Sequence, residues 1–236
     1  GAESLPKSIV RDTAKKIIST SGSLPVGNTD LTVVAQASSI AQLWLNEATD
    51  FAPLTSATRT LSRSDWIDST LAGWQVTVEP LATGLAAAVA ELMQQAINDG
   101  EAGETPMPIE TIATLLRSFI SALIATQLGQ AIGGIATTAT GAHDAGLPIL
   151  EPARPLLIPE NIENWAAESE IPKTEVYLFR ALREGAVARL FEHNPWIVSY
   201  IRSAIVEYGA GIRIDLDAIQ RQAEEAMQGM GEQSFT

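Results

Sequence analysis

The stretch PKTEVYLFRALREGAVARLFEHNPWIVSYIRSAIVEYGAG, residues 172–211, is the best-defined part of the sequence. Pro172 is tolerated in the first turn of a helix, and apolar residues follow it at spacings of three and four. Asn194 followed by Pro195 is typical of a helix start, and Gly209 of a helix end. The stretch therefore predicts two helices joined by a tight corner. The buried stripe predicted for the first helix consists of Val176, Phe179, Leu182, Ala186 and Leu190.

Helical spacing recurs along most of the chain, and no window alternates as a strand would. Only Leu156–Ile158 is typical of a short extended piece. We therefore expect an all-α, mainly helical fold with little or no sheet, formed as one domain over residues 29–236. Residues 1–28 are expected to form an N-terminal arm. We also expect a helix to break at Gly73, with Pro80 near the start of the next one.

The residues from Ser118 to Ala142 include no charged side chain. This length is sufficient to span a bilayer. Gln127 and Gln130 lie at its centre, however, and Arg117 flanks one end without an aromatic belt. We therefore favour a helix that is buried on all sides in a soluble domain, and a membrane span is the alternative.

Composition limits the classes of function. The chain has 236 residues, of which 46% are apolar, so it can bury a full core. Its net charge of -13 disfavours nucleic acid and anionic membrane surfaces as partners, because both attract basic proteins. The absence of cysteine excludes a thiolate metal site and a cysteine nucleophile, and it agrees with a cytoplasmic location.

Few residues are suited to chemistry, because the common catalytic motifs are missing. The two histidines, His143 and His193, are fifty residues apart. His143 beside Asp144 could act as a base or a metal ligand, although a solvated loop histidine is the commoner case. His193 precedes the predicted corner, where a partial positive charge favours a helix C-terminus. A zinc site that uses both histidines and Glu184 is an alternative.

Four segments carry a resemblance, and they are VAQASSIAQLWLNEATDF (34–51), SRSDWIDSTLAGWQVTVEPLATGLA (62–86), LGQAIGGIATTATGAHDAGLPIL (128–150) and EVYLFRALREGAVARLFEHNPWIVSYIRSAIVEYGAGIRIDLDAI (175–219). In this order and spacing they resemble actinobacterial zincin-like hydrolases, known as zinc-dependent metalloproteases, and a sister branch associated with biosynthesis of a deazaflavin cofactor. The resemblance covers about residues 34–220 and implies a helical zincin-like domain. Metal-binding members carry His-Glu-x-x-His, in which two histidines one turn apart bind zinc and the glutamate polarises water.

On this sequence the motif falls at residues 183–187, where Glu184 alone keeps the family residue. Arg183 stands in the first histidine position and Val187 in the second. Arginine stays cationic and valine has no lone pair, so neither can bind a metal. The resemblance therefore implies a hydrolase homologue in which we expect no zinc and no other cofactor. We expect Glu184 to pair with a nearby arginine such as Arg180.

These observations predict a catalytically inactive zincin-like protein. It would act in the cytoplasm as a binding or scaffold module for an unknown protein or peptide partner, through a cleft beside Glu184. The alternative is an active metal-dependent peptidase with a rearranged site that uses His143, Asp144, His193 and Glu184. Whether the chain is an enzyme therefore depends on how these residues are arranged in space.

Overall fold

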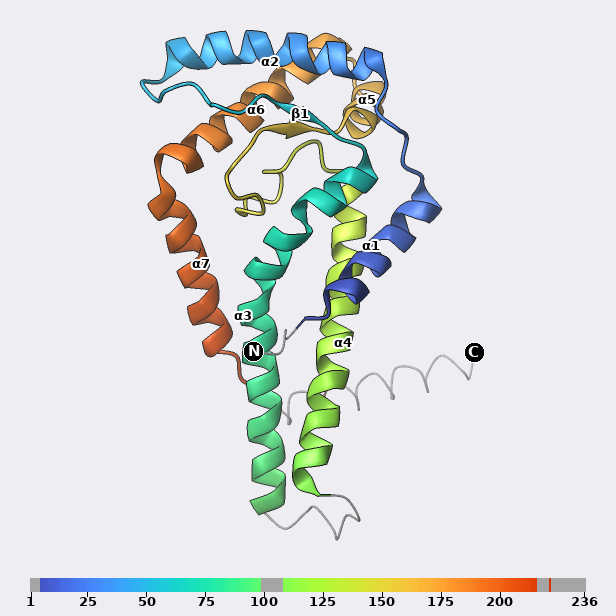
Figure 1. Ribbon diagram of the computed structural model, residues 1–236, viewed down its shortest axis with the longest axis vertical. Coiled ribbons are helices and arrows are strands. Elements are labelled where there is room, and N and C mark those ends of the chain that lie inside the picture. The colour runs from blue at the N-terminus through green and yellow to red at the C-terminus, as the bar shows by residue number, and fades with distance from the viewer. Residues whose placement is uncertain (1–4, 99–107, 216–220, 222–236) are drawn as a thin grey trace.

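The computed structural model describes residues 5–98, 108–215 and 221, and Figure 1 shows how they are arranged. Within this part of the chain, seven helices and one two-stranded sheet follow one another. The elements are α1 (Lys7–Ser21), α2 (Asn28–Ala48), β1 (Arg59–Thr60), α3 (Arg63–Asn98), α4 (Ile109–Ala136), β2 (Leu156–Leu157), α5 (Pro159–Ala167), α6 (Lys173–His193) and α7 (Pro195–Ala210). The predicted mainly helical fold with very little sheet is confirmed.

The helices α3 and α4 form a long hairpin that extends away from the rest of the molecule (Figure 1). The predicted break at Gly73 is wrong, because α3 continues through it and through Pro80. A side chain at Gly73 would collide with the backbone of Ile149. This glycine therefore lets the loop after α4 approach α3, and it does not end the helix.

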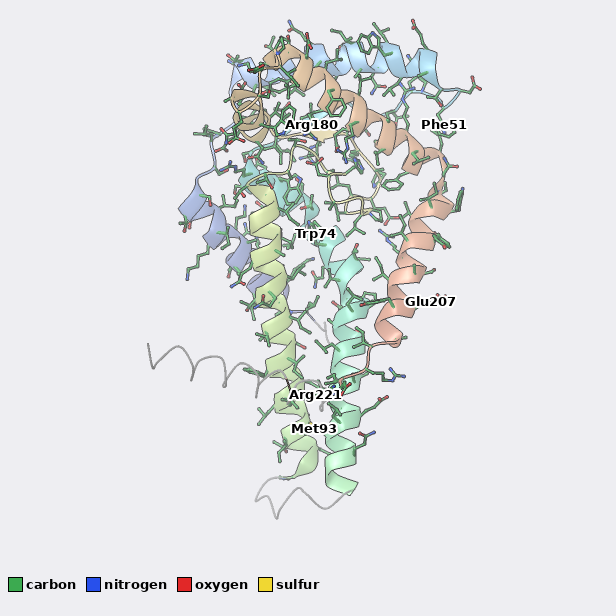
Figure 2. All side chains as sticks on the ribbon, turned by 180° about the vertical axis from the view of Figure 1, so that it is seen from behind. Phe51, Trp74, Met93, Arg180, Glu207 and Arg221 are labelled. Carbon is green, nitrogen blue, oxygen red and sulfur yellow. The ribbon has the colours of Figure 1, made fainter. Side chains whose placement is uncertain are left out.

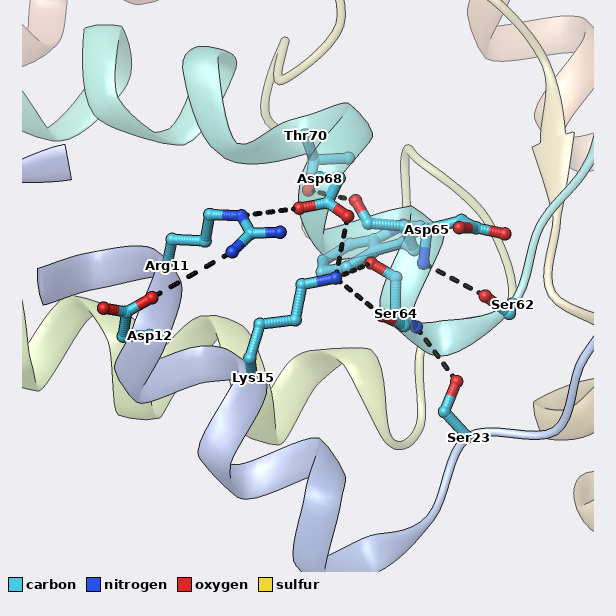
Figure 3. A network of polar contacts seen from close by, with 10 residues as sticks. Arg11, Asp12, Lys15, Ser23, Ser62, Ser64, Asp65, Asp68 and Thr70 are labelled. Carbon is cyan, nitrogen blue, oxygen red and sulfur yellow. Dashed lines mark hydrogen bonds and ion pairs between the residues drawn. The ribbon is translucent and has the colours of Figure 1, made fainter. Parts of the chain in front are cut away.

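The larger core lies between α1, α3, α4 and the loop after α4. Trp66 and Trp74 of α3 meet edge to face in it, with 6.5 Å between their ring centroids. Outside this core, Arg11 and Lys15 of α1 bind the two carboxylate oxygens of Asp68 in α3 at 3.0 and 2.7 Å (Figure 3). Helix α1 is thus held against α3 by charge and against α4 by apolar packing. The domain boundary predicted at residue 28 stays a prediction.

The uncharged stretch that begins at Ser118 is buried over only part of its length. The buried apolar side chains of α4 are Ala125, Leu128, Ile132 and Ala136. In its N-terminal half Leu115, Phe119 and Leu123 are 59%, 65% and 49% exposed. The predicted burial on all sides is wrong for this half, because α1 packs against the other half, around Gly129 and Gly133.

Two segments of the hairpin are long and apolar enough to cross a membrane when judged by length and composition alone. They are Arg63–Met93 and Glu110–Ala136. Core helices of soluble proteins pass the same test, so this result by itself is weak evidence for a membrane span.

The small sheet fixes the loop between α4 and α5. Strands β1 and β2 pair in parallel, and Gly141 forms an antiparallel bridge to Leu157. The indole N–H of Trp66 donates a hydrogen bond of 3.1 Å to the carbonyl oxygen of Gly141. The extended piece predicted at Leu156–Ile158 is confirmed at its first two residues. Because β2 also contacts α6, this arrangement brings residues 141–157 next to that helix.

A second core joins α2, α5 and α6. It includes Val34, Ala37, Ala41, Ile162, Ala166, Val176 and Tyr177. Helix α6 ends at His193 and α7 begins at Pro195, so the predicted corner is confirmed. Helix α6 therefore lies between this second core and the loop that carries His143.

Candidate functional site

The buried face of α6 differs from the predicted stripe. Val176 is buried as predicted, but Phe179 is 55% exposed and Leu190 is 39% exposed. The residues that α6 buries are Val176, Tyr177, Ala181, Glu184, Gly185, Ala188, Arg189 and Phe191. The buried face therefore includes one carboxylate and one guanidinium, which an analysis of apolar spacing does not find.

Glu184 lies at the centre of this face and is 2% exposed. Its Oε1 accepts the backbone N–H of His143 at 2.9 Å, and its Oε2 accepts that of Leu156 at 3.3 Å. The same Oε2 lies 3.0 Å from Nδ1 of His143. Burial of a carboxylate is costly unless it is hydrogen-bonded, and these contacts offset that cost. The predicted pairing of Glu184 with Arg180 is wrong, because the carboxylate points into the protein.

Gly141 permits this close contact between the loop and α6. A Cβ atom at this position would overlap the carboxylate of Glu184. Glycine has no Cβ, so the backbone can approach a buried side chain that any other residue would displace. The bridge to Leu157 and the hydrogen bond from Trp66 hold the glycine in place. The loop therefore fills the space beside the Glu184 carboxylate.

His143 is not the solvated loop residue that we expected. It is 3% exposed, and its ring lies against Phe191 with 5.7 Å between ring centroids. Both its backbone N–H and its Nδ1 contact Glu184. In the described part of the chain, its Nε2 has no hydrogen-bond partner. The structure thus brings His143 and Glu184, two of the residues named in the alternative interpretation, into contact.

The two positions at which the predicted motif would carry histidine do not face a shared centre with Glu184. Arg183 is exposed and Val187 is half-buried. Neither side chain can give a lone pair to a metal ion, and both oxygens of Glu184 already bind N–H groups. Among residues 5–98, 108–215 and 221, no three His, Cys, Asp or Glu side chains are grouped so that they could hold a metal ion. The residues present therefore do not fit a zinc site of the kind that the resemblance implies.

Asp144, the neighbour of His143, has a structural contact. Its Oδ2 accepts the backbone N–H of Thr140 at 2.6 Å and the hydroxyl of the same residue at 3.1 Å. These bonds close the turn that leads into Gly141 and His143. Asp144 thus shapes the loop, and it does not contact Glu184.

His193 lies apart from the His143–Glu184 cluster, at the end of α6. Its Nε2 is 3.0 Å from the carbonyl oxygen of Ala52, and its ring stacks on Phe51 with 5.2 Å between centroids. Figure 2 shows Phe51 next to the corner between α6 and α7. The predicted site that uses both histidines is therefore not assembled in the structure.

Arg189 is a buried charge that the sequence analysis missed, and it is 1% exposed. Its guanidinium donates to the side-chain oxygens of Gln42 at 2.5 Å and Asn46 at 2.7 Å, and to the backbone carbonyl of Phe51 at 3.3 Å. Because these acceptors are neutral, burial lowers the pKa of Arg189. Gln42 and Asn46 are one turn apart on α2, and this spacing of two amides was the available signal.

Arg180 contacts aromatic rings and not Glu184. Its guanidinium lies over Trp165 of α5, 5.1 Å from the ring centroid, and 5.5 Å from that of Phe179 (Figure 2). A cation above an aromatic face is attracted by the ring quadrupole. Arg180 therefore joins α5 to α6 from the side that carries Arg183.

The comparison with known proteins agrees with this architecture. A sequence model of the zincin-like metallopeptidase family matches residues 7–235. No curated protein and no solved structure matches the chain. The family match extends from α1 to α7 and includes both the loop with His143 and the helix with Glu184. The chain belongs to the zincin-like metallopeptidase family.

Proposed function

We propose that this chain is a non-hydrolytic member of the zincin-like metallopeptidase family that acts by binding a protein or peptide. One observation carries the proposal. Both carboxylate oxygens of Glu184 are engaged by N–H groups of the loop at His143 and Leu156. A glutamate that polarises water must lie within reach of that water, and Glu184 is 2% exposed with the loop packed against it. Glu184 instead fastens a loop to α6.

The two motif positions beside Glu184 give independent support. A histidine at each of these positions would donate a nitrogen lone pair to zinc. Arg183 and Val187 cannot do so, and two metal ligands are therefore missing. The missing ligands are not supplied from elsewhere in the described residues, where no metal-binding group of three forms. The proposal therefore includes no zinc and no other cofactor.

A binding role is supported by the aromatic residues on the outer side of α7. Trp196, Tyr200 and Tyr208 are 65%, 70% and 73% exposed. Tryptophan and tyrosine are enriched among the residues that contribute most to protein–protein binding. The net charge of -13 disfavours nucleic acid as the partner. A protein or peptide is thus the class of partner that best fits this surface.

Metal content tests the non-hydrolytic assignment directly. The purified chain is incubated with zinc chloride, dialysed, and analysed by elemental mass spectrometry. We expect far less than one zinc per chain, and no change in Glu184→Gln. An Arg183→His/Val187→His variant restores both histidines and serves as the comparator. Stoichiometric zinc in the unmodified chain, lost in Glu184→Gln and His143→Gln, would contradict the proposal.

A second candidate is a hydrolase that uses His143 and Glu184 as a base and its orienting carboxylate, because these groups are 3.0 Å apart. Within the described residues, however, no hydroxyl is hydrogen-bonded to the other ring nitrogen of His143. A panel of peptide and ester substrates, assayed with and without a chelator, separates the candidates. Turnover that disappears in His143→Gln would favour this hydrolase, and its absence agrees with the binding role.

The binding role has its own experiment. The tagged chain and a Trp196→Ser/Tyr200→Ser variant are used to co-purify interacting proteins, which are quantified by mass spectrometry. Leu24→Ser is the matched control, because Leu24 is 64% exposed and distant from α7 in sequence. We expect a reproducible partner that the α7 variant loses and the control keeps. Equal recovery by all three chains would show that α7 is not the binding surface.

A further inference from the structure

The segment between α2 and β1 forms a groove against the side of α2. The chain turns back after α2 and runs alongside this helix before it enters β1 (Figure 1). One wall of the groove consists of residues 53–58. The other wall consists of four small or polar residues of α2, and these are Ala35, Ser38, Ser39 and Gln42. The space between the walls is about 360 Å³, and we call it the α2 groove.

Residues 54–58 of the first wall alternate in burial as a strand does. Leu54, Ser56 and Thr58 are half-buried, whereas the residues between them are exposed. Within the part of the chain that the structure describes, no hydrogen bond joins the main chain of residues 54–58 to another residue. This wall therefore continues β1 as an extended segment whose main-chain donors and acceptors are unused.

The pairing of β1 shows which edge of this segment is free. The N–H groups of Arg59 and Leu61 each donate a hydrogen bond of 3.0 Å to a carbonyl oxygen within or next to β2. Successive residues of a strand direct their main-chain groups to opposite edges, so Thr60 directs its N–H and C=O away from β2. Strand β1 lies between β2 and α2 (Figure 1). The free edge is therefore on the side of the α2 groove.

The α2 wall of the groove adds a hydroxyl group without a partner. The Oγ atom of Ser38 is buried, and no described residue forms a hydrogen bond with it. Leaving a buried polar group unpaired costs free energy, which a bound molecule with a donor or an acceptor would recover. Ser38 is thus a second polar feature of this groove that points to a ligand, independent of the strand edge.

The chemistry of the two walls limits what can occupy the groove. Neither residues 53–58 nor the four wall residues of α2 include a charged side chain. A phosphate group would need basic side chains, so a nucleotide or a lipid headgroup fits poorly. An edge with unpaired N–H and C=O groups instead requires a partner that offers both, in alternation. The main chain of an extended peptide has this property.

We propose that the α2 groove binds a peptide of another protein in an extended conformation, as a strand added to the free edge of residues 54–60. Donors and acceptors recur along this edge at the two-residue period of a strand, about 6.6–6.8 Å, and an extended peptide presents its own groups at the same period. The small side chains of Ala35, Ser38 and Ser39 leave room for the peptide beside α2. This inference rests on the proposed binding role, but it places the peptide at a site separate from the aromatic residues of α7.

A phage-displayed library of random peptides supplies the probe. Selected peptides are synthesised with a fluorophore, and fluorescence anisotropy with the full chain gives their Kd, which we expect to be micromolar. Ala35→Trp places a bulky side chain in the groove at an exposed position, so it should weaken binding by about tenfold or more. Leu43→Trp adds the same side chain elsewhere on α2, where Leu43 is 63% exposed, and is the matched control. Circular dichroism verifies that both variants are folded.

Methylation of main-chain nitrogens in the selected peptide tests the strand pairing itself. Each N-methyl group removes one donor and leaves the side chain unchanged. In an added strand only every second N–H faces the partner strand. Methylation at these alternate positions should therefore weaken binding by about tenfold, and methylation at the positions between them should have little effect.

Three results would each overturn the proposal. They are a library that yields no binding peptide, equal affinity of Ala35→Trp and Leu43→Trp for the peptide, and an effect of N-methylation that does not alternate. The Trp196→Ser/Tyr200→Ser variant should keep its affinity for the peptide, because its groove is intact. Loss of the peptide by this variant but not by Ala35→Trp would assign the peptide to α7 and remove it from the groove. Co-purification with the α7 variant tests the proposed binding role separately, so failure of the groove and failure of that role give different results.

Discussion

The carboxylate of Glu184 and the ring of Phe119 are opposite cases on two long helices. Glu184 is charged and 2% exposed, whereas Phe119 is apolar and 65% exposed. At Glu184, a loop distant in sequence supplies N–H groups that replace water. At Phe119, most of the ring stays in contact with water. Burial is therefore decided by what the surrounding fold provides and not by residue type alone.

This difference also separates two kinds of evidence about function. The polar groups around Glu184 are buried and hydrogen-bonded to one another, so they support a structural role for this glutamate. Leu115, Phe119 and Leu123 of α4 and the aromatic residues of α7 are exposed to water, so they are available for contacts with other molecules. In this protein the Glu184 cluster and the exposed apolar and aromatic surfaces lie in different places.

Glu184→Ala should have the largest effect on stability. It leaves the backbone N–H groups of His143 and Leu156 buried without an acceptor, and loss of one partner from a buried charged cluster costs about 3–5 kcal/mol. Glu192→Ala changes an exposed carboxylate on the same helix and should cost under about 0.5 kcal/mol. Urea denaturation followed by circular dichroism measures both. Equal losses in the two variants would show that Glu184 does not fasten the loop.

The two phenylalanines test the same contrast with one residue type. Phe191 is 8% exposed and contacts the ring of His143, so Phe191→Ala should cost about 3–4 kcal/mol. Phe119→Ala should change stability by less than about 0.5 kcal/mol. The midpoint of urea unfolding gives both values. A large loss from Phe119→Ala would mean that this ring is covered within one chain.

Gly141→Ala should reduce stability by about 2 kcal/mol, because the added methyl group overlaps the Glu184 carboxylate and forces the loop away. Gly134→Ala is the matched control. Apart from its chain neighbours and the nearby backbone of α4, no atom lies within 4 Å of the position that its Cβ would take. The better helix propensity of alanine should therefore stabilise α4 by about 0.5 kcal/mol. Thermal denaturation of the two variants should move in opposite directions. If both destabilise the chain alike, the close approach at Gly141 is not the cause.

Asp68→Asn should have the smallest effect, and that effect should depend on pH. Burial alone would raise the pKa of Asp68, but hydrogen bonds and charges from Lys15 and Arg11 lower it (Figure 3). Because its pKa is lower in the folded state than in the unfolded state, Asp68 stabilises the protein at pH values above its unfolded-state pKa. This contribution is lost as the pH falls through the folded-state pKa. The carboxylate is 44% exposed, so the loss at neutral pH is about 0.5 kcal/mol. Unfolding experiments at pH 7 and in acid should show the gap to the unmodified chain closing, and a constant gap would exclude a role of the charge.

The sequence predicted the class of the fold because helical periods and helix boundaries are local signals. Asn194 and Pro195 marked the corner between α6 and α7, and Leu156–Ile158 was predicted to be a short extended piece. The same reasoning failed at Gly73, where a glycine that usually ends a helix instead admits the backbone of Ile149. A local rule cannot anticipate a neighbour that arrives from 76 positions further along the chain.

The candidate site was only partly predictable for the same reason. That Arg183 and Val187 cannot bind a metal could be concluded from the sequence, because it is a property of the residues themselves. The side of α6 that is buried could not be predicted from the sequence, since Phe179 and Leu190 are apolar yet exposed. Arg189 is charged yet buried because Gln42 and Asn46 accept its hydrogen bonds from another helix.

By itself, the sequence determined that this protein is mainly helical and that residues 183–187 contain no histidine. Tertiary structure decided what the remaining Glu184 does, because the groups that bind it come from residues 41 and 28 positions away. It also decided which apolar residues stay in contact with water, since α1 covers one half of α4 and leaves Phe119 exposed. Composition and spacing are read along the chain, whereas hydrogen-bond satisfaction and burial depend on segments that meet only after folding.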